Sequence, residues 1–166
     1  RRGLVSETVE PLINKRVEYK KRIREMEEIP LREVYRRRQS AHKWLLVTCF
    51  GYLGYKNARF GRIEAHEAVT AYGRECLLRA KEIAEKRGFR VLHANVDSLW
   101  VQKRGTTKKG TQTHPGKITK AECDALLAEI TRVTRIPIAL EGIYRWVAFL
   151  PSRQDERMSV ANRYIG

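Results

Sequence analysis

Apolar residues in the first part of the chain recur at the three- and four-residue spacing of helices. A stripe beginning at Val9 predicts a helix from an N-cap at Ser6 to about residue 28, and Pro30 interrupts it. A second helix is expected over about residues 31–47. Two consecutive helices joined by a short turn predict an αα-hairpin.

The next segment, CFGYLGYKNARFG at residues 49–61, does not follow this pattern. Its three glycines and several aromatic residues predict a turn and a closely packed irregular segment, with no continuation of the helix. A long helix is then expected over about residues 65–87, with Gly88 as its C-cap.

Two runs of β-type residues, 89–94 and 98–102, predict a β-hairpin with Asp97 at its tip. A basic, flexible loop is expected after the hairpin, over residues 103–118. The acid at the tip is unusual, because the strands on both sides of it are strongly apolar.

Thr119 and Glu122 predict a capping box for a helix that runs to about residue 134. Helices combined with antiparallel strands indicate an α+β fold, in which an antiparallel sheet is backed by helices and the first two helices form a projection. The remaining strands are expected over residues 136–142, 144–151 and 159–166.

The composition adds a strong basic charge to this picture. The 166 residues include 34 Lys and Arg against 19 Asp and Glu, a net charge of +15, which favours a polyanionic partner and by default nucleic acid. The plain alternative is a basic protein with a solvated surface. Three widely spaced cysteines argue against a zinc site or a disulfide framework and fit a reducing compartment. No apolar run reaches membrane-spanning length, and no signal peptide opens the sequence.

Two acidic residues stand at the ends of predicted strands. Asp97 lies between two apolar runs, and Glu141 follows a third and precedes a glycine. Mg²⁺ takes oxygen ligands, typically one or two carboxylates plus substrate phosphates, so neighbouring strands could bring both acids to one site. The alternatives are a turn Asp that caps its own backbone and a surface Glu at a strand edge.

Three basic residues are candidates for binding a polyanion. Arg16 and Lys20 are one turn apart on the first predicted helix, and Lys43 lies on the second. If the helices pack side by side, the three could converge on a triphosphate. A solvated basic face is the alternative interpretation for each of them.

Five segments resemble, in order and spacing, the motifs of family B DNA polymerases. KWLLVTCFGYLGYKNARFG resembles motif B, VTAYGRECL the helix after it, and VLHANVDSLWV motif C. LINKRVEYKKRI resembles the first helix of the fingers, and ANRYIG the Lys/Arg-Tyr element that holds the primer. The pattern is similar to the divergent archaeal and bacterial branch known as the second B-type polymerases.

For the nucleotide site, the resemblance implies two groups of residues. Arg16, Lys20 and Lys43 would bind the incoming triphosphate. Phe50 and Gly51 would lie under the nascent base pair, where the family usually has Tyr-Gly.

For the chemistry and the DNA, the resemblance implies four further roles. Asp97 would be the motif C acid that ligates metal, and Glu141 an accessory catalytic acid near it. Arg163 and Tyr164 would contact the primer strand.

The resemblance as a whole implies a fragment of a DNA-directed DNA polymerase that uses two Mg²⁺ ions to transfer nucleotides from dNTPs. Residues 1–48 would form the fingers hairpin and residues 49–166 a partial palm. The implied partners are primer-template DNA, dNTPs and the rest of the polymerase chain, with no membrane. The implied location is the cytoplasm, in association with the nucleoid.

Three positions depart from the family pattern. Asn95 stands in place of the first motif C Asp, His93 in place of its Tyr, and Val47 in place of the motif B Asn. Motif A, with its Asp, is expected upstream of Arg1, so the isolated chain is expected not to extend a primer. Asn95 and Val47 favour the alternative of a catalytically inactive DNA-binding module. A basic RNA-binding protein is a third hypothesis, supported by charge alone.

Overall fold

The computed structural model describes residues 3–105 and 116–166, apart from the side chains of residues 161 and 162. The chain divides into two compact units, Arg1–Thr70 and Ala71–Gly166. Most of the loop predicted to be flexible over residues 103–118 lies outside the described residues. No helix in the described part of the chain is long and apolar enough to cross a membrane.

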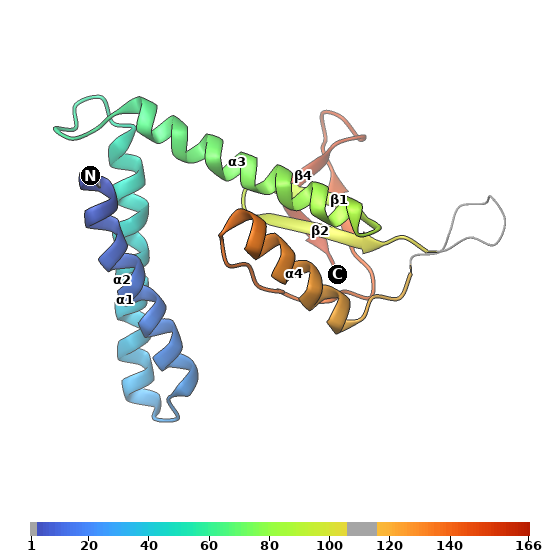
Figure 1. Ribbon diagram of the computed structural model, residues 1–166, viewed down its shortest axis with the longest axis horizontal. Helices are drawn as coiled ribbons and strands as arrows, with labels where there is room; N and C mark the ends of the chain where they lie inside the picture. Colours follow the sequence, from blue (N-terminus) through green and yellow to red (C-terminus); the bar gives the residue numbers. More distant parts are fainter. Residues whose placement is uncertain (1–2, 106–115) are drawn as a thin grey trace. The chain divides into compact units, whose positions relative to one another are not determined.

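The first unit is built on a helical hairpin. Helices α1 (Leu4–Glu25) and α2 (Ile29–Leu53) lie side by side and antiparallel, as the αα-hairpin prediction requires (Figure 1). Helix α3 (Ile63–Lys86) begins in this unit and continues into the second. Tyr35, one of two buried residues of α2, packs its ring against Tyr19 of α1, with ring centroids 5.6 Å apart.

The start of α1 and the end of α2 differ from the prediction. The N-cap of α1 is Gly3, not Ser6, and it makes no side-chain hydrogen bond. Helix α2 does not stop near residue 47 but continues to Leu53, through part of the glycine-rich segment. A glycine in a helix costs about 1 kcal/mol, and burying Leu53 to 7% exposure offsets that cost.

The second unit contains two antiparallel hairpins and one more helix. Strands β1 (Phe89–Asn95) and β2 (Ser98–Lys103) form one two-stranded sheet, and β3 (Ala148–Pro151) and β4 (Ser159–Ile165) form the other. Gly88 ends α3 with φ of 81°, as its predicted C-cap role requires. The α+β class is confirmed.

Helix α4 (Lys120–Thr134) begins with the predicted capping box. The Thr119 side chain accepts a hydrogen bond from the backbone N–H of Glu122, and the Glu122 carboxylate accepts one from the backbone N–H of Thr119. The two bonds satisfy backbone donors that have no partner inside the helix, which explains why the start of α4 was predictable from sequence.

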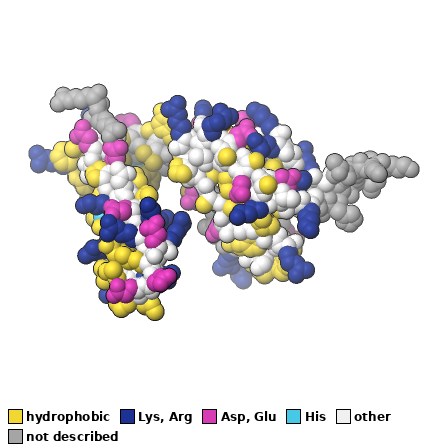
Figure 2. Space-filling model, turned by 60° about the horizontal axis from the view of Figure 1, so that its bottom comes forward, with side chains coloured by type: hydrophobic (Ala, Val, Ile, Leu, Met, Phe, Trp, Pro, Cys, Tyr) yellow, Lys and Arg dark blue, Asp and Glu magenta, His cyan; other side chains and the backbone are white. Residues whose placement is uncertain are grey.

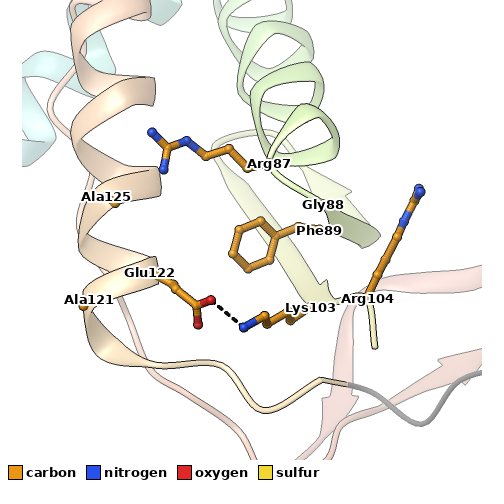
Figure 3. Close-up of a pocket in the computed structure, with 8 residues that line it drawn as sticks. All are labelled: Arg87, Gly88, Phe89, Lys103, Arg104, Ala121, Glu122 and Ala125. Atoms are coloured by element: carbon orange, nitrogen blue, oxygen red, sulfur yellow. Dashed lines mark hydrogen bonds and ion pairs between the residues drawn. The ribbon is translucent and has the colours of Figure 1, made fainter. Parts of the chain in front are cut away.

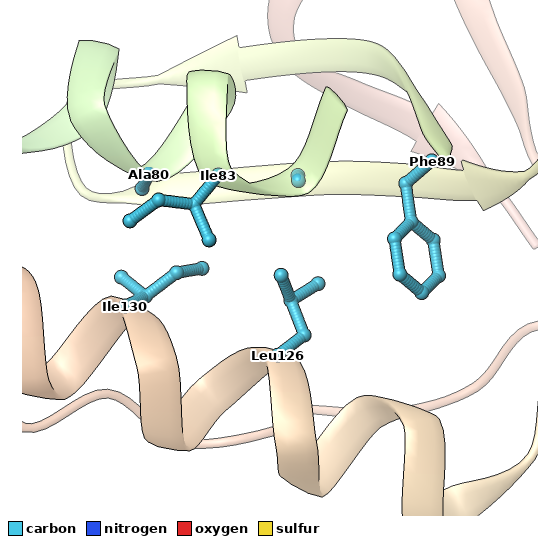
Figure 4. Close-up of a cluster of buried hydrophobic side chains, with 6 residues drawn as sticks. Ala80, Ile83, Phe89, Leu126 and Ile130 are labelled. Atoms are coloured by element: carbon cyan, nitrogen blue, oxygen red, sulfur yellow. The ribbon is translucent and has the colours of Figure 1, made fainter. Parts of the chain in front are cut away.

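The core of the second unit lies between α3, α4 and the first hairpin. Apolar side chains of α3 and α4 face each other, with Phe89 of β1 beside them (Figure 4). Val91, Leu99 and Val101 of the β1–β2 hairpin pack against the same cluster. The buried members are Ala80, Ile83, Ala84, Phe89, Leu126 and Ile130.

A β-bulge in β1 changes the face of the first hairpin to which its side chains point. The register of β1 against β2 shifts between Val91 and His93. Because side chains alternate along a strand, the extra residue lets Val91 pack on the core while His93 points to the opposite face. There His93 meets Phe149 of β3, with ring centroids 4.8 Å apart.

The strand predicted over residues 136–142 is wrong. Ile136, Ile138 and Leu140 alternate as a strand requires and remain partly exposed, but no described strand pairs with them. Alternation alone cannot make a strand without a partner for its backbone groups. The strand predicted over residues 144–151 is shorter than expected, because only Ala148–Pro151 pairs with β4.

Candidate functional site: a basic helical face and an exposed hairpin acid

Two contacts fix how the helices of the first unit face each other. Arg22 Nη1 of α1 donates a hydrogen bond of 2.8 Å to the hydroxyl of Tyr35 on α2. Further along the hairpin, the rings of Tyr19 and His42 meet edge to face, with centroids 5.2 Å apart. From the first contact to the second, the residue number falls from 22 to 19 on α1 and rises from 35 to 42 on α2, so the helices run antiparallel.

Arg16 lies in the interface between these helices. With the Gln39 amide turned so that its oxygen faces the guanidinium, that oxygen accepts hydrogen bonds from Arg16 Nε at 2.9 Å and Nη2 at 3.1 Å. The contact leaves Arg16 half-buried and holds its side chain in place. Lys20 and Lys43 each follow a member of this pair by one helical turn and are exposed.

Helix geometry brings Lys20 and Lys43 to the same face of the hairpin. Each lysine directly follows one of the two residues whose rings touch, Tyr19 and His42, and one residue is about 100° of rotation around a helix. In an antiparallel pair, the same rotation from the contact brings both side chains to the same side. Arg16, Lys20 and Lys43 therefore share one face, which we call the basic face.

Phe50 and Gly51 follow the basic face toward the end of α2. Phe50 lies two helical turns beyond Lys43, and residues spaced by whole turns lie on the same side of a helix. Gly51 comes next and is exposed. Apart from its two chain neighbours and the backbone of its own helix, no described atom lies within 4 Å of the position that a Cβ would occupy. Figure 2 shows Lys and Arg side chains along this hairpin, interspersed with acidic and hydrophobic side chains.

Asp97 lies in the second unit, in the two-residue turn between β1 and β2. Its neighbour Val96 has φ of 43° and is 80% exposed, a conformation that a β-branched residue rarely adopts. Asp97 is exposed too, and its carboxylate makes no hydrogen bond or ion pair with the described residues. The tip of the hairpin thus presents a free carboxylate to solvent.

Glu141 lies in the irregular segment that replaces the predicted strand and is also exposed. The described residues contain no group of three or more His, Cys, Asp or Glu side chains that could hold a metal ion. Asp97 and Glu141 therefore belong to no such group in the described part of the chain. Their shared site stays a prediction.

Arg163 and Tyr164 lie on β4. Arg163 is exposed, whereas the ring of Tyr164 packs on Trp100 of β2, with centroids 4.6 Å apart. Tyr144 joins the same aromatic cluster, and the neighbouring Tyr164 hydroxyl raises the pKa of Tyr144 above its usual value. The cluster connects the two hairpins of the second unit and fixes the backbone that carries Arg163.

A pocket of about 490 Å³ lies at the open end of the β1–β2 hairpin, the end opposite Asp97 (Figure 3). Lys103 forms an ion pair there with Glu122, and this contact together with the capping box holds the pKa of Glu122 at about 2. The pocket includes none of the predicted site residues. Its lining is Arg87, Gly88, Phe89, Lys103, Arg104, Ala121, Glu122 and Ala125.

Comparison with known proteins decides the family. Residues 1–124 match the sequence profile of DNA polymerase family B. The chain belongs to this family. It is 44% identical over 101 residues, 61% of its length, to DNA polymerase 2 of Saccharolobus solfataricus. It is 28% identical over 167 aligned residues, 98% of its length, to a DNA polymerase of Archaeoglobus fulgidus.

These relatives are much longer than the chain described. The matched stretch makes up 14% of the Saccharolobus protein and 20% of the Archaeoglobus protein. A similar match, 28% identical over 87% of the chain, covers 9% of the DNA polymerase alpha catalytic subunit of Dictyostelium discoideum. The chain thus corresponds to one region of a family B DNA polymerase.

Sequence reasoning missed one residue beside the candidate site of this family B member. His66, in the first turn of α3, stacks on Phe50 with ring centroids 4.2 Å apart. Sixteen positions separate the two residues. No local pattern indicates the contact, because it depends on how the segment between α2 and α3 turns back.

Proposed function

We propose that this chain is the nucleotide-binding and metal-ligating part of a DNA-directed DNA polymerase. The parent protein would add nucleotides from dNTPs to a primer under the direction of a template. Membership of DNA polymerase family B supports the reaction class. The observation that carries the proposal is the basic face, on which three cations of two helices share one side of the hairpin.

The basic face suits a triphosphate. Arg16 has a planar guanidinium that is already fixed by Gln39, so binding an anion costs little additional side-chain entropy. Lys20 and Lys43 are exposed and able to reach a ligand as flexible point charges. We assign all three to the phosphate groups of the incoming dNTP.

Phe50 and Gly51 are assigned to the surface beneath the nascent base pair. A glycine inside a helix is unfavourable by about 1 kcal/mol, and no described neighbour requires it at position 51. Close approach by a ligand is a physical reason for this glycine. The half-buried ring of Phe50 offers an apolar surface next to it.

Asp97 is assigned as a ligand of Mg²⁺. A carboxylate oxygen is the donor that Mg²⁺ prefers, and Asp97 is exposed with no internal contact to give up. One carboxylate is not a complete site, so substrate phosphates and acids elsewhere in the parent chain would supply further ligands. Bound Mg²⁺ would stabilise the charge that develops on the transferred phosphoryl group. Glu141 is assigned as an accessory acid.

Arg163 and Tyr164 are assigned to the primer strand, with the aromatic cluster fixing their strand. Residues 1–48 are proposed as fingers and residues 49–166 as part of the palm. We place the parent protein in the cytoplasm with the nucleoid. Its partners would be primer-template DNA, dNTPs and the remainder of its own chain.

A second candidate is a DNA-binding module that kept the fold and lost catalysis. Asn95 and Val47 favour it, because both stand where the resemblance leads us to expect other residues. The two candidates differ in one property. A polymerase consumes dNTPs in the order that the template specifies, whereas the module only binds DNA.

The test is single-nucleotide incorporation by the full-length protein. The protein is mixed with primer-template DNA, Mg²⁺ and one dNTP at a time, for each of the four template bases. We expect incorporation of the complementary nucleotide in every case. DNA binding without incorporation of any nucleotide would reject the polymerase and favour the inactive module.

A further inference from the structure

His66 makes two contacts with one residue of the candidate nucleotide site. Its ring stacks on the Phe50 ring, with centroids 4.2 Å apart and an interplanar angle of 22°. Its Nδ1 lies 3.1 Å from the backbone carbonyl oxygen of Phe50. The side chain and the main chain of Phe50 are thus held by a single imidazole.

The contact with the backbone has a clear physical origin. Helix α2 ends at Leu53, so the carbonyl of Phe50 is among the last four, which lack the usual helical partner. The N–H of Gly54, which would normally bond to it, instead donates to the carbonyl oxygen of Gly51 at 3.2 Å. A carbonyl only accepts hydrogen bonds, so Nδ1 of His66 is the donor that satisfies Phe50.

Gly54 leaves the space that the imidazole needs. A Cβ at position 54 would lie 3.0 Å from Nδ1 of His66 and 3.1 Å from its Cγ. The backbone of Gly54 has φ of −86°, which any residue adopts, so its conformation does not require glycine. The close approach of the His66 ring does.

We propose that His66 is a positioning residue for the nucleotide site, which it serves by fixing the ring and the carbonyl of Phe50. The imidazole stacks on one face of the Phe50 ring, the ring assigned to support the nascent base pair. This inference rests on the proposed function. A support held in one position favours base pairs of the correct shape, because discrimination requires the site to be rigid.

Three substitutions of His66 in the full-length protein separate its two contacts with Phe50. His66→Phe keeps a ring and loses the N–H donor. His66→Asn keeps a donor near the Nδ1 position and loses the ring, and His66→Ala loses both. Gly54→Ala keeps the His66 side chain unchanged, but the added methyl group displaces its ring. Glu67→Gln, at an exposed neighbouring position on α3, is the matched control.

The main readout is the ratio of kcat/KM for the correct dNTP to that for each incorrect dNTP. We expect His66→Ala and Gly54→Ala to lower this ratio about tenfold. We expect His66→Phe and His66→Asn to lower it less, and Glu67→Gln to leave it unchanged. The melting temperature of each variant shows whether a loss comes from unfolding instead.

A second readout does not depend on activity. With 4-fluorophenylalanine at position 50 of the full-length protein, we expect one sharp ¹⁹F resonance, which shifts and broadens in His66→Ala. An unchanged resonance, or an unchanged discrimination ratio in a folded His66→Ala variant, would overturn the positioning role. Lys43→Ala keeps the two proposals distinct: if it leaves the KM for dNTPs unchanged, the nucleotide site itself is misassigned.

Discussion

Replacing Lys43 with alanine in the full-length protein tests the basic face directly. Lys43 is exposed on α2 and makes no ion pair with a described residue, so its removal breaks no ion pair within the described part of the chain. The phosphate groups are the same in all four dNTPs. Lys43→Ala should therefore raise the KM for every dNTP alike and leave the choice of base nearly unchanged.

The size of the effect follows from the position of Lys43. A hydrogen bond to a charged group contributes about 1.5–3 kcal/mol where it is partly desolvated, and less where it is exposed. Because Lys43 is exposed in the free chain, a bound triphosphate would desolvate it only in part, and the low end of this range applies. The expected rise in KM is about tenfold.

Steady-state incorporation of single nucleotides measures this KM, and two other cations of α2 serve as comparisons. Arg36 forms an ion pair with Glu33, with 3.6 Å between Nη1 and Oε2, and it lies further than Lys43 from the end of α2. Arg36→Ala should therefore act more weakly than Lys43→Ala. Arg37 is 82% exposed and about 120° around the helix from Lys43, so Arg37→Ala should have no effect. A KM unchanged by Lys43→Ala, or raised for one dNTP only, would refute the triphosphate assignment.

Four further predictions follow from the charge, the core, the capping box and the proposed catalytic acids. DNA binding should weaken steeply with salt, with a log–log slope of about −0.9 per phosphate contact, and a flat titration would contradict it. Leu126→Ala should lower the free energy of unfolding by about 2–5 kcal/mol, whereas Leu78→Ala, at an exposed site, should cost far less; equal losses would show the core to be misplaced. The pKa of Glu122 falls from 4.5 to about 2 on folding, so its stabilisation is present above pH 4.5 and disappears as the pH falls toward 2. The difference in melting temperature between the wild type and Glu122→Gln should shrink over that range, and a constant difference would contradict it. The isolated 166-residue chain should not extend a primer, and extension that Asp97→Asn abolishes would point to a second acid within it.

Local signals account for the parts of the fold that were predictable. The start of α4 depends on Thr119 and Glu122, three residues apart, and its capping box forms as expected. The β1–β2 hairpin is encoded by two neighbouring strands and a short turn. Both structures bring together residues that are already close in sequence.

Predictions failed where a distant partner decides the outcome. Helix α2 continues through Gly51 because Leu53 is buried, and its break falls at Gly54 and beyond. Residues 136–142 alternate like a strand but lack a described strand to pair with. The contact of His66 with Phe50 depends on the turn between two helices, so nothing near either residue in the sequence indicates it.

The candidate site divides in the same way. The placement of Arg16, Lys20 and Lys43 on one face follows from helix periodicity once the hairpin is known to be antiparallel. The association of Asp97 with Glu141 depends on strand pairing that the described residues do not contain. Helix geometry therefore places the basic face, whereas no described strand pairing places Asp97 beside Glu141.

Primer extension by the full-length protein, with and without the Asp97 carboxylate, tests the central claim most directly. We predict that the wild type and Asp124→Asn, a matched change at an exposed position on α4, extend a primer in the presence of Mg²⁺. Asp97→Asn should bind the same primer-template DNA with unchanged affinity and fail to extend it. Extension by Asp97→Asn at the wild-type rate would contradict the assignment of Asp97 as the metal-ligating acid of a DNA polymerase.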